Sequence, residues 1–173
     1  FLNASFWAHT ASARKGCILY FHGGGLVFGT SDDLPGIYRN KFTQAGYDFI
    51  SLSYPLAPET NLCTILDAAT ASVTYLLEHP RELGYETMPP YFLFGRSAGA
   101  YLALNVAHRL CNCSKFCPGQ LQTETAETLT AVSAANYPTP AGILSFYGYH
   151  TFDIPEFKKA NLTYKKLPAV PKQ

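Results

Sequence analysis

One stretch of the sequence decides the fold: Tyr91-Phe92-Leu93-Phe94-Gly95-Arg96-Ser97-Ala98-Gly99-Ala100. Its first four residues are aromatic or aliphatic, which predicts a buried strand bounded by Gly95. Residues 100–107 contain neither Gly nor Pro and predict a helix. A strand that passes directly into a helix must turn sharply, so we expect the apex residue, Ser97, to have a strained backbone. Gly95 and Gly99 flank the apex because a Cβ at either position would collide with the turning backbone.

This turn is expected to expose the Ser97 hydroxyl at the carboxyl edge of a sheet, beside the N-terminus of a helix. Such a position is how a weak nucleophile is presented for acyl transfer. A serine between two glycines is by itself most often an ordinary turn. The strand predicted before Ser97 and the helix predicted after it favour the interpretation as a nucleophile.

A glycine-rich segment, His22-Gly23-Gly24-Gly25, follows a second apolar run at residues 17–21, which predicts another buried parallel strand. Three successive glycines leave backbone N–H groups uncovered by side chains. A phosphate-binding loop would need Gly-Lys-Ser/Thr, or Gly-x-Gly-x-x-Gly opening a helix, and neither occurs here. We therefore predict an oxyanion hole, in which two N–H donors face the developing charge of a tetrahedral intermediate. His22 is expected to brace this loop, and the alternative is that it acts as a base.

The remaining elements alternate between strands and helices. Apolar spacing predicts a helix that begins at Asp32 and Asp33 and is stopped by Gly46, and another over residues 62–77 closed by Pro80. Further strands are predicted at 47–53 and 142–147. This order is typical of α/β proteins with an open, mostly parallel sheet and flanking helices.

Other segments have weaker patterns. Phe1, Phe6 and Trp7 are interpreted as the remnant of earlier strands, and a short helix is predicted near residues 124–132 within a polar, irregular region. Residues 149–173, rich in aromatics and prolines, are expected to begin a cap or excursion. We interpret residues 1–173 as a single partial domain that is incomplete at both ends.

Composition excludes several classes of protein. With 173 residues, 47% hydrophobic and 14% charged, the chain is expected to form a compact globular core. A net charge of +1 gives no indication of binding to nucleic acid or to an anionic membrane. No apolar run reaches the length of a membrane span and no basic-then-apolar leader is present, so we expect a cytoplasmic protein.

The five cysteines do not form a recognisable metal-binding pattern. Cys17, in a predicted strand, and Cys63, in a predicted helix, are expected to be buried apolar residues. Cys111, Cys113 and Cys117 are closely spaced, but not as Cys-x2-Cys, and are expected to be reduced thiols in a loop; the alternative is a metal site. No metal or cofactor is predicted.

Three motifs together resemble the hormone-sensitive-lipase-like branch of the α/β-hydrolases: His-Gly-Gly-Gly at 22–25, Tyr-x-Leu-Ala-Pro-Glu at 54–59 and Gly-Arg-Ser-Ala-Gly at 95–99. The resemblance runs from about residue 17 to 152. It implies hydrolysis of small carboxylic esters through an acyl-enzyme, without a cofactor. The residue roles that it implies are Ser97 as nucleophile, Gly24, Gly25 and Ala98 as N–H donors of the oxyanion hole, Gly23 as a loop-shaping residue, and Glu59 and Asp67 as structural anchors or, alternatively, solvated charges.

The sequence departs from this family in its general base. The catalytic order in the fold is Ser, then Asp or Glu, then His. After Ser97 the only histidines are His108, which is predicted within a helix, and His150. His150 as base and Asp153 as a displaced acid are alternatives, but we expect the acid and the base to lie beyond residue 173 and this chain alone to be inactive. A second hypothesis is a non-catalytic module that binds a ligand or partner, and a third is a peptidase of the same fold.

Overall fold

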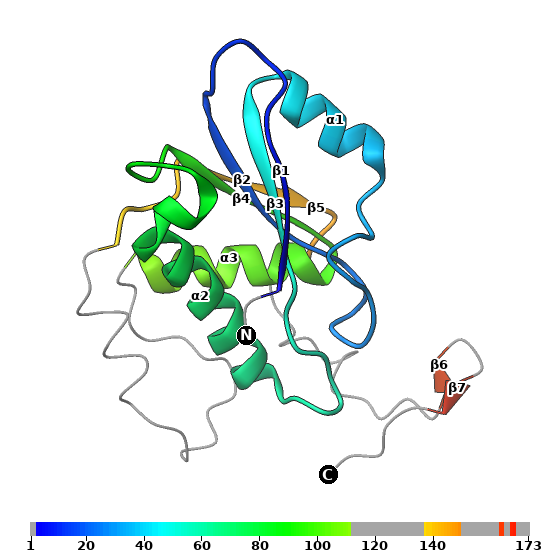
Figure 1. Cartoon of the computed structure of the whole chain (residues 1–173). Coiled ribbons are helices and arrows are strands. Elements are labelled where there is room, and N and C mark those ends of the chain that lie inside the picture. The colour runs from blue at the N-terminus through cyan, green and yellow to red at the C-terminus, as the bar shows by residue number, and fades with distance from the viewer. Residues whose placement is uncertain (1–2, 112–136, 150–162, 165–166, 169–173) are drawn as a thin grey trace.

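The computed structural model describes residues 3–111, 137–149, 163–164 and 167–168. A five-stranded sheet with the order β1-β3-β2-β4-β5 forms its centre (Figure 1). The strands are β1 (Ala4–Trp7), β2 (Gly16–Phe21), β3 (Tyr47–Leu52), β4 (Tyr91–Arg96) and β5 (Gly142–Phe146). Strands β3, β2, β4 and β5 are mutually parallel and β1 is antiparallel to β3, which confirms the predicted mostly parallel sheet.

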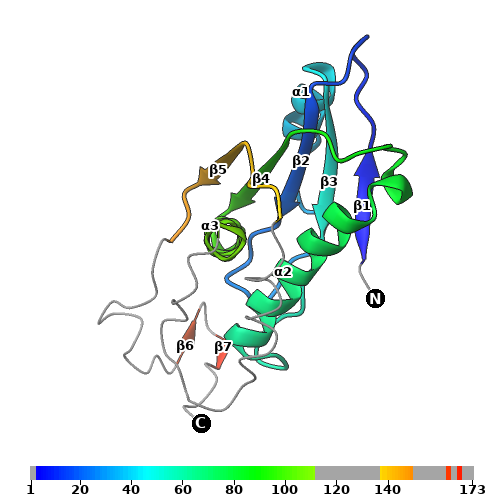
Figure 2. The same ribbon diagram turned by 90° about the vertical axis from the view of Figure 1, so that its left-hand side faces the viewer.

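Helices cover both faces of the sheet, and this explains why β2 is buried at all six positions. Alternate residues of a strand point to opposite faces. Cys17, Leu19 and Phe21 pack into one core with α2 (Leu62–Glu78) and α3 (Ala98–Leu110), whereas Ile18 and Tyr20 pack into another with Phe42 of α1 (Gly36–Gln44). In Figure 2, α2 and α3 lie beside the sheet, and α1 lies at the top of the view.

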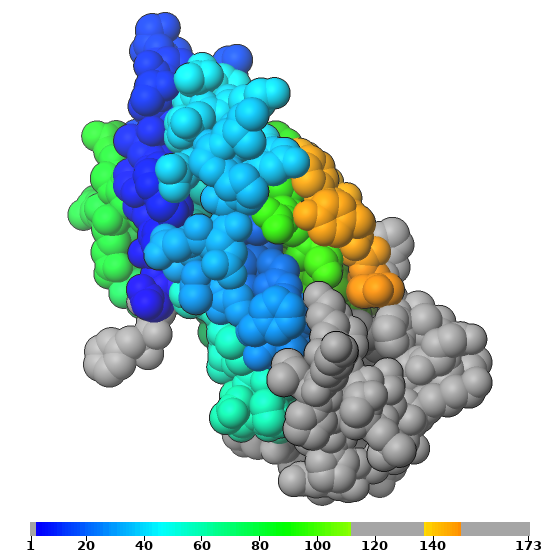
Figure 3. Space-filling model, turned by 90° about the vertical axis from the view of Figure 1, so that its right-hand side faces the viewer, coloured from blue at the N-terminus to red at the C-terminus, as the bar shows by residue number. Residues whose placement is uncertain are grey.

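The carboxyl ends of β2 and β4 lie side by side at the centre of the sheet. Phe21, the last residue of β2, pairs with Gly95 of β4. The loops that follow these two strands therefore meet at one edge of the sheet. On the face shown in Figure 3, α1 and the segment before it (blue to cyan) lie beside β5 and the residues that follow it (orange).

The structure differs from the sequence-based expectations at several boundaries. Helix α1 begins at Gly36 and not at Asp32, because the Asp33 carboxylate accepts a hydrogen bond from the Thr30 N–H at 2.7 Å and closes a turn before Pro35. The 3-10 helix η1 (Pro80–Leu83) and the antiparallel pair β6 (Thr163–Tyr164) and β7 (Leu167–Pro168) were not predicted.

Other expectations are confirmed or lie outside the described residues. Phe6 and Trp7 belong to β1, as expected, whereas Phe1 and the helix predicted at 124–132 lie outside the described residues. Cys17 is fully buried, and burial raises the pKa of its thiol to about 12. Cys63 was expected to be buried, but it is only partly buried.

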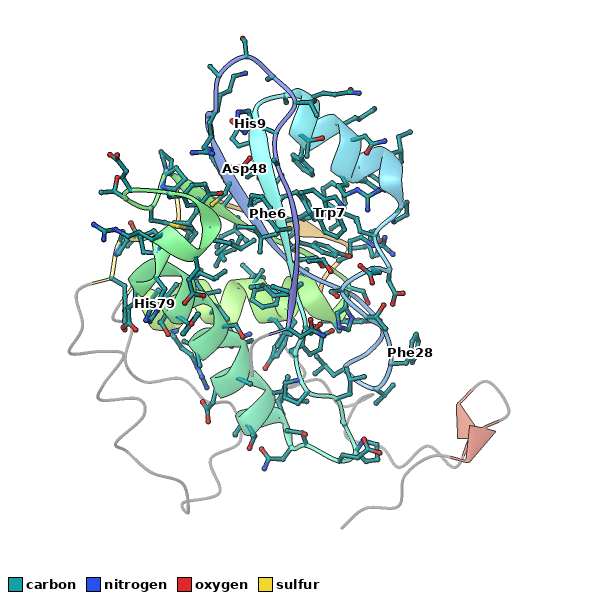
Figure 4. The ribbon with its side chains drawn as sticks, in the orientation of Figure 1. Phe6, Trp7, His9, Phe28, Asp48 and His79 are labelled. Carbon is teal, nitrogen blue, oxygen red and sulfur yellow. The ribbon has the colours of Figure 1, made fainter. Side chains whose placement is uncertain are left out.

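A buried carboxylate ties the β1–β2 connection to the sheet at its amino edge. Asp48, the second residue of β3, is fully buried and accepts hydrogen bonds at 2.7 Å from both the backbone N–H and Nδ1 of His9. Its other oxygen accepts from Arg14 Nε at 2.7 Å and from the Tyr85 hydroxyl at 2.9 Å. Figure 4 shows His9 and Asp48 together, far from the labelled Phe28.

Tyr20 carries a hydroxyl that contributes nothing evident to stability. Its side chain is fully buried among Phe49 and Phe94, and within the described part of the chain its oxygen has no hydrogen-bond partner. Burial raises the pKa of this hydroxyl to about 12. A buried hydroxyl without a partner loses its hydration and regains nothing.

We therefore expect Tyr20→Phe to stabilise the protein by about 1 kcal/mol, with a rise in Tm of about 2–4 °C. Thermal unfolding followed by circular dichroism measures this. The matched control is Tyr85→Phe, which removes a hydroxyl bonded to Asp48 and should lower Tm. A Tm for Tyr20→Phe below that of the wild type would contradict the expectation.

Candidate active site

Ser97 alone connects β4 to α3. The strand ends at Arg96 and the helix begins at Ala98, which confirms the strand and the helix predicted on its two sides. Its φ of 53° and ψ of −120° lie in a region that non-glycine residues rarely occupy. Such strain persists only where the surrounding structure enforces it, and it concentrates at functional sites.

Close packing explains the two glycines that flank Ser97. A Cβ on Gly95 would lie 2.1 Å from the carbonyl oxygen of Gly99, and a Cβ on Gly99 would lie 2.1 Å from the carbonyl oxygen of Phe21. Both distances are far below van der Waals contact. Helix α3 therefore packs directly on the ends of β4 and β2, and only glycine allows that approach.

Hydrogen bonds hold the Ser97 backbone, whereas its hydroxyl forms none within the residues that the structure describes. The Ser97 N–H donates to the carbonyl of Phe146 at 2.9 Å, and its carbonyl accepts from the N–H of Ala100 at 3.0 Å. A serine before a helix usually caps it through its side chain, but Ser97 makes no such bond. Ser97 is partly exposed and not fully buried.

The glycine loop after β2 lies against this turn. A Cβ on Gly23 would lie 3.5 Å from the Cβ of Ser97 and 3.1 Å from the carbonyl oxygen of Arg96. Within residues 3–111 and 137–149, the N–H groups of Gly24, Gly25 and Ala98 donate to no carbonyl or side chain. Three unused donors thus belong to the glycine loop and to the first residue of α3, which adjoin at the Ser97 turn.

His22 is held in a way that favours the bracing role. Its side chain is buried and stacks on Tyr54, with ring centroids 4.2 Å apart and an interplanar angle of 12°. Nδ1 lies 2.7 Å from the carbonyl oxygen of Gly23, which can only accept, so Nδ1 carries the proton. Burial lowers the pKa of the imidazole, which keeps the ring neutral.

Comparison with known proteins agrees with this geometry. Residues 18–166 match the alpha/beta hydrolase fold family. The chain belongs to this family. Relatives include Esterase LipI of Mycobacterium tuberculosis, 33% identical over 106 residues, and an ethyl acetate hydrolase of Pseudomonas putida, 31% identical over 105 residues. The matched regions cover 60% and 61% of this chain but only 33% of each relative.

A solved structure of similar fold comes from Staphylococcus aureus, a protein described as having unknown function. It is 31% identical with a TM-score of 0.65, and the match covers 92% of this chain and 46% of that one. The chain therefore spans about a third of the length of the curated relatives and about half of this structural neighbour. The family is that of the alpha/beta hydrolase fold, and the two relatives are named as an esterase and an ethyl acetate hydrolase.

The two predicted anchors of this alpha/beta hydrolase chain differ from one another. Asp67 of α2 accepts a hydrogen bond from Arg109 of α3 at 2.7 Å and so joins the two helices. Glu59 is exposed and, within the described residues, forms neither a hydrogen bond nor an ion pair. The alternative of a solvated charge therefore describes Glu59, and the anchoring interpretation describes Asp67.

Of the two histidines that follow Ser97, only His108 lies within the described residues. His108 lies in α3, as predicted, and is exposed. His150 and Asp153 lie outside the described residues. Among the residues that the structure describes, no group of three or more His, Cys, Asp or Glu side chains could hold a metal ion. Cys113 and Cys117 lie outside the described residues. None of the helices described is long and apolar enough to cross a membrane.

Two features of this alpha/beta hydrolase chain were not assigned a role from the sequence. The hydroxyl of Tyr54 donates to the carbonyl of His22 at 2.8 Å, and the N–H of Ala57 donates to the carbonyl of Leu26 at 2.8 Å. Both donors belong to the proline-containing motif at 54–59. The sequence signal for this role was a tyrosine directly before a segment with two closely spaced prolines. Prolines make a loop rigid, and a rigid loop can hold a neighbouring loop in place.

Proposed function

We propose that the protein is a serine hydrolase of small carboxylic esters that acts through an acyl-enzyme on Ser97. The observation that carries this proposal is the turn at Ser97. Its φ is 53°, its hydroxyl forms no hydrogen bond within the described residues, and the glycine loop lies against it at Gly23. A strained serine next to unpaired backbone donors has no evident structural purpose. It is, however, the arrangement that acyl transfer requires.

In this mechanism Ser97 Oγ attacks the ester carbonyl carbon while a general base accepts its proton. The carbonyl oxygen becomes an oxyanion, which the N–H groups of Gly24, Gly25 and Ala98 would stabilise. Collapse of the tetrahedral intermediate breaks the bond to the alcohol oxygen, which receives the proton. Water then attacks the acyl-enzyme by the same sequence and releases the acid. The base and its acidic partner would come from residues that the structure does not describe.

The alternative is a non-catalytic module that binds a ligand or partner. Binding alone would not require backbone strain at Ser97, whose hydroxyl makes no hydrogen bond within the described residues. A serine that only caps a helix would adopt an ordinary extended conformation. The geometry therefore favours the enzyme over the binding module.

The full-length protein should hydrolyse p-nitrophenyl acetate. The steady-state release of p-nitrophenolate is measured by its absorbance at about 405 nm. Rapid acid quenching followed by peptide mass spectrometry should find acetylation of the peptide that contains Ser97. A full-length protein that neither releases p-nitrophenol nor becomes acetylated would support the binding module. Acetylation of another residue would contradict the role of Ser97.

A further inference from the structure

We propose that Tyr54 is a positioning residue for the oxyanion hole, acting through His22 on the N–H of Gly24. This inference rests on the proposed function, since it assigns a role within the same site. Tyr54 touches neither Ser97 nor the unused N–H groups in the contacts described above. Its effect is exerted through the backbone of the loop.

The orientation of the unused donors follows from the carbonyls that precede them. The peptide unit is planar, so the N–H of one residue points opposite to the carbonyl of the residue before it. The carbonyl of Gly23 accepts from His22 Nδ1 at 2.7 Å, and this bond fixes the direction of the Gly24 N–H. The carbonyl of Gly24 accepts from the N–H groups of Val27 and Phe28 at 3.1 and 3.2 Å, which fixes the Gly25 N–H.

The Gly24 N–H therefore depends on where the His22 ring lies. Two contacts with Tyr54 hold that residue: its hydroxyl donates to the His22 carbonyl at 2.8 Å, and its ring stacks on the imidazole with centroids 4.2 Å apart. Tyr54 is only 6% exposed, so its side chain is largely shielded from bulk water. The Tyr54 phenol thus contacts His22, and the His22 imidazole in turn contacts the Gly23 carbonyl.

The same loop also holds the far end of the glycine segment. The N–H of Ala57 donates to the carbonyl of Leu26, three residues after Gly23. Leu26 has a φ of 65°, so its backbone also needs external support. Residues 54–57 thus hold the glycine loop at both His22 and Leu26, and Tyr54 provides the contact nearer to Gly24.

The variant Tyr54→Phe separates the hydrogen bond from the stacking. Phenylalanine keeps the ring but leaves the His22 carbonyl without its donor. In the full-length protein we expect kcat for p-nitrophenyl acetate to fall about tenfold. Removal of a whole oxyanion donor lowers kcat by about 10²–10³-fold, whereas this change only makes one donor less well oriented. KM should stay within twofold, since the ground-state ester is not bound by this donor. Affinity for phenylboronic acid, which forms a tetrahedral anion on serine, should fall by the same factor as kcat.

A matched control removes the same chemical group elsewhere. Tyr91 is 2% exposed and its hydroxyl donates to the carbonyl of Pro138 at 2.6 Å, at the amino end of β4. Tyr91→Phe should therefore lower Tm much as Tyr54→Phe does, yet leave kcat unchanged. Equal kcat in Tyr54→Phe and Tyr91→Phe would overturn the inference, because it would mean that Tyr54 serves stability alone.

A second readout does not depend on activity. In protein labelled with ¹⁵N-glycine, the NMR order parameter of the Gly24 N–H should fall in Tyr54→Phe and not in Tyr91→Phe. An unchanged order parameter overturns the positioning role whether or not the enzyme is active. Absence of wild-type hydrolysis, in contrast, contradicts the proposed function and leaves this test in force.

Discussion

Replacement of Ser97 by alanine should reduce kcat for ester hydrolysis by about 10⁴–10⁶ in the full-length protein, since loss of the nucleophile removes the covalent path entirely. Alanine keeps the Cβ of Ser97 and removes only the oxygen, which makes no hydrogen bond within the described residues. The fold should therefore be preserved, with Tm within a few degrees of the wild type. The activity that remains would reflect the N–H donors and substrate binding alone.

Steady-state kinetics with p-nitrophenyl acetate and thermal unfolding, measured on the same samples, test this expectation. The control is Ser72→Ala on α2, which removes a hydroxyl that donates to the carbonyl of Ala68 within its own helix at 2.9 Å. Ser72→Ala should retain wild-type kcat. If Ser97→Ala also retained it, the nucleophile would lie elsewhere and the interpretation of the strained turn would be wrong.

The parallel strands were predictable because their environment is uniform. Residues 17–21 and 91–94 are continuous apolar runs, and burial on both faces of a sheet requires such runs. The turn at Ser97 was predictable for a different reason. A Cβ on either flanking glycine would lie 2.1 Å from a backbone oxygen, so local geometry dictates the sequence there.

Contacts between residues distant in sequence could not be predicted in this way. His9 and Asp48 are 39 residues apart, and no periodicity links them. The bond between Tyr54 and the His22 carbonyl spans 32 residues. Both contacts depend on which loops the sheet order brings together, and a single charged or aromatic residue leaves no repeating pattern. The sequence therefore predicted the glycine loop but not the residues that hold it.

Substitution of Asp48 by asparagine should destabilise the protein by about 3–5 kcal/mol near neutral pH, the usual cost of breaking a buried ion pair by removing one partner. Asp48 accepts from His9, Arg14 and Tyr85 through both oxygens. Asparagine keeps the shape but turns one oxygen into an N–H donor, which would face donors. The charge of Arg14 would also lose its partner.

The effect should depend on pH in a defined direction. Burial alone would raise the pKa of the Asp48 carboxyl, but the hydrogen bonds from the backbone and side chain of His9 and from Tyr85, with the charge of Arg14, outweigh burial and lower it. A carboxyl whose pKa is lower in the folded state stabilises the fold fully above its unfolded pKa of about 3.9. This contribution is lost as the pH falls through the lower folded value.

Urea denaturation of the wild type and Asp48→Asn between pH 7 and pH 3 measures this contribution. The difference in unfolding free energy should be constant from pH 7 to about pH 5 and should shrink below about pH 4, where the wild-type carboxyl begins to protonate in the unfolded chain. Asp67→Asn is the control, because Asp67 pairs with Arg109 but is 39% exposed, and it should cost less than about 1 kcal/mol. A difference for Asp48→Asn that is no larger than this, or that grows in acid, would show that the four bonds to Asp48 do not act as a charged cluster, and the β1–β2 connection would then be held by packing alone.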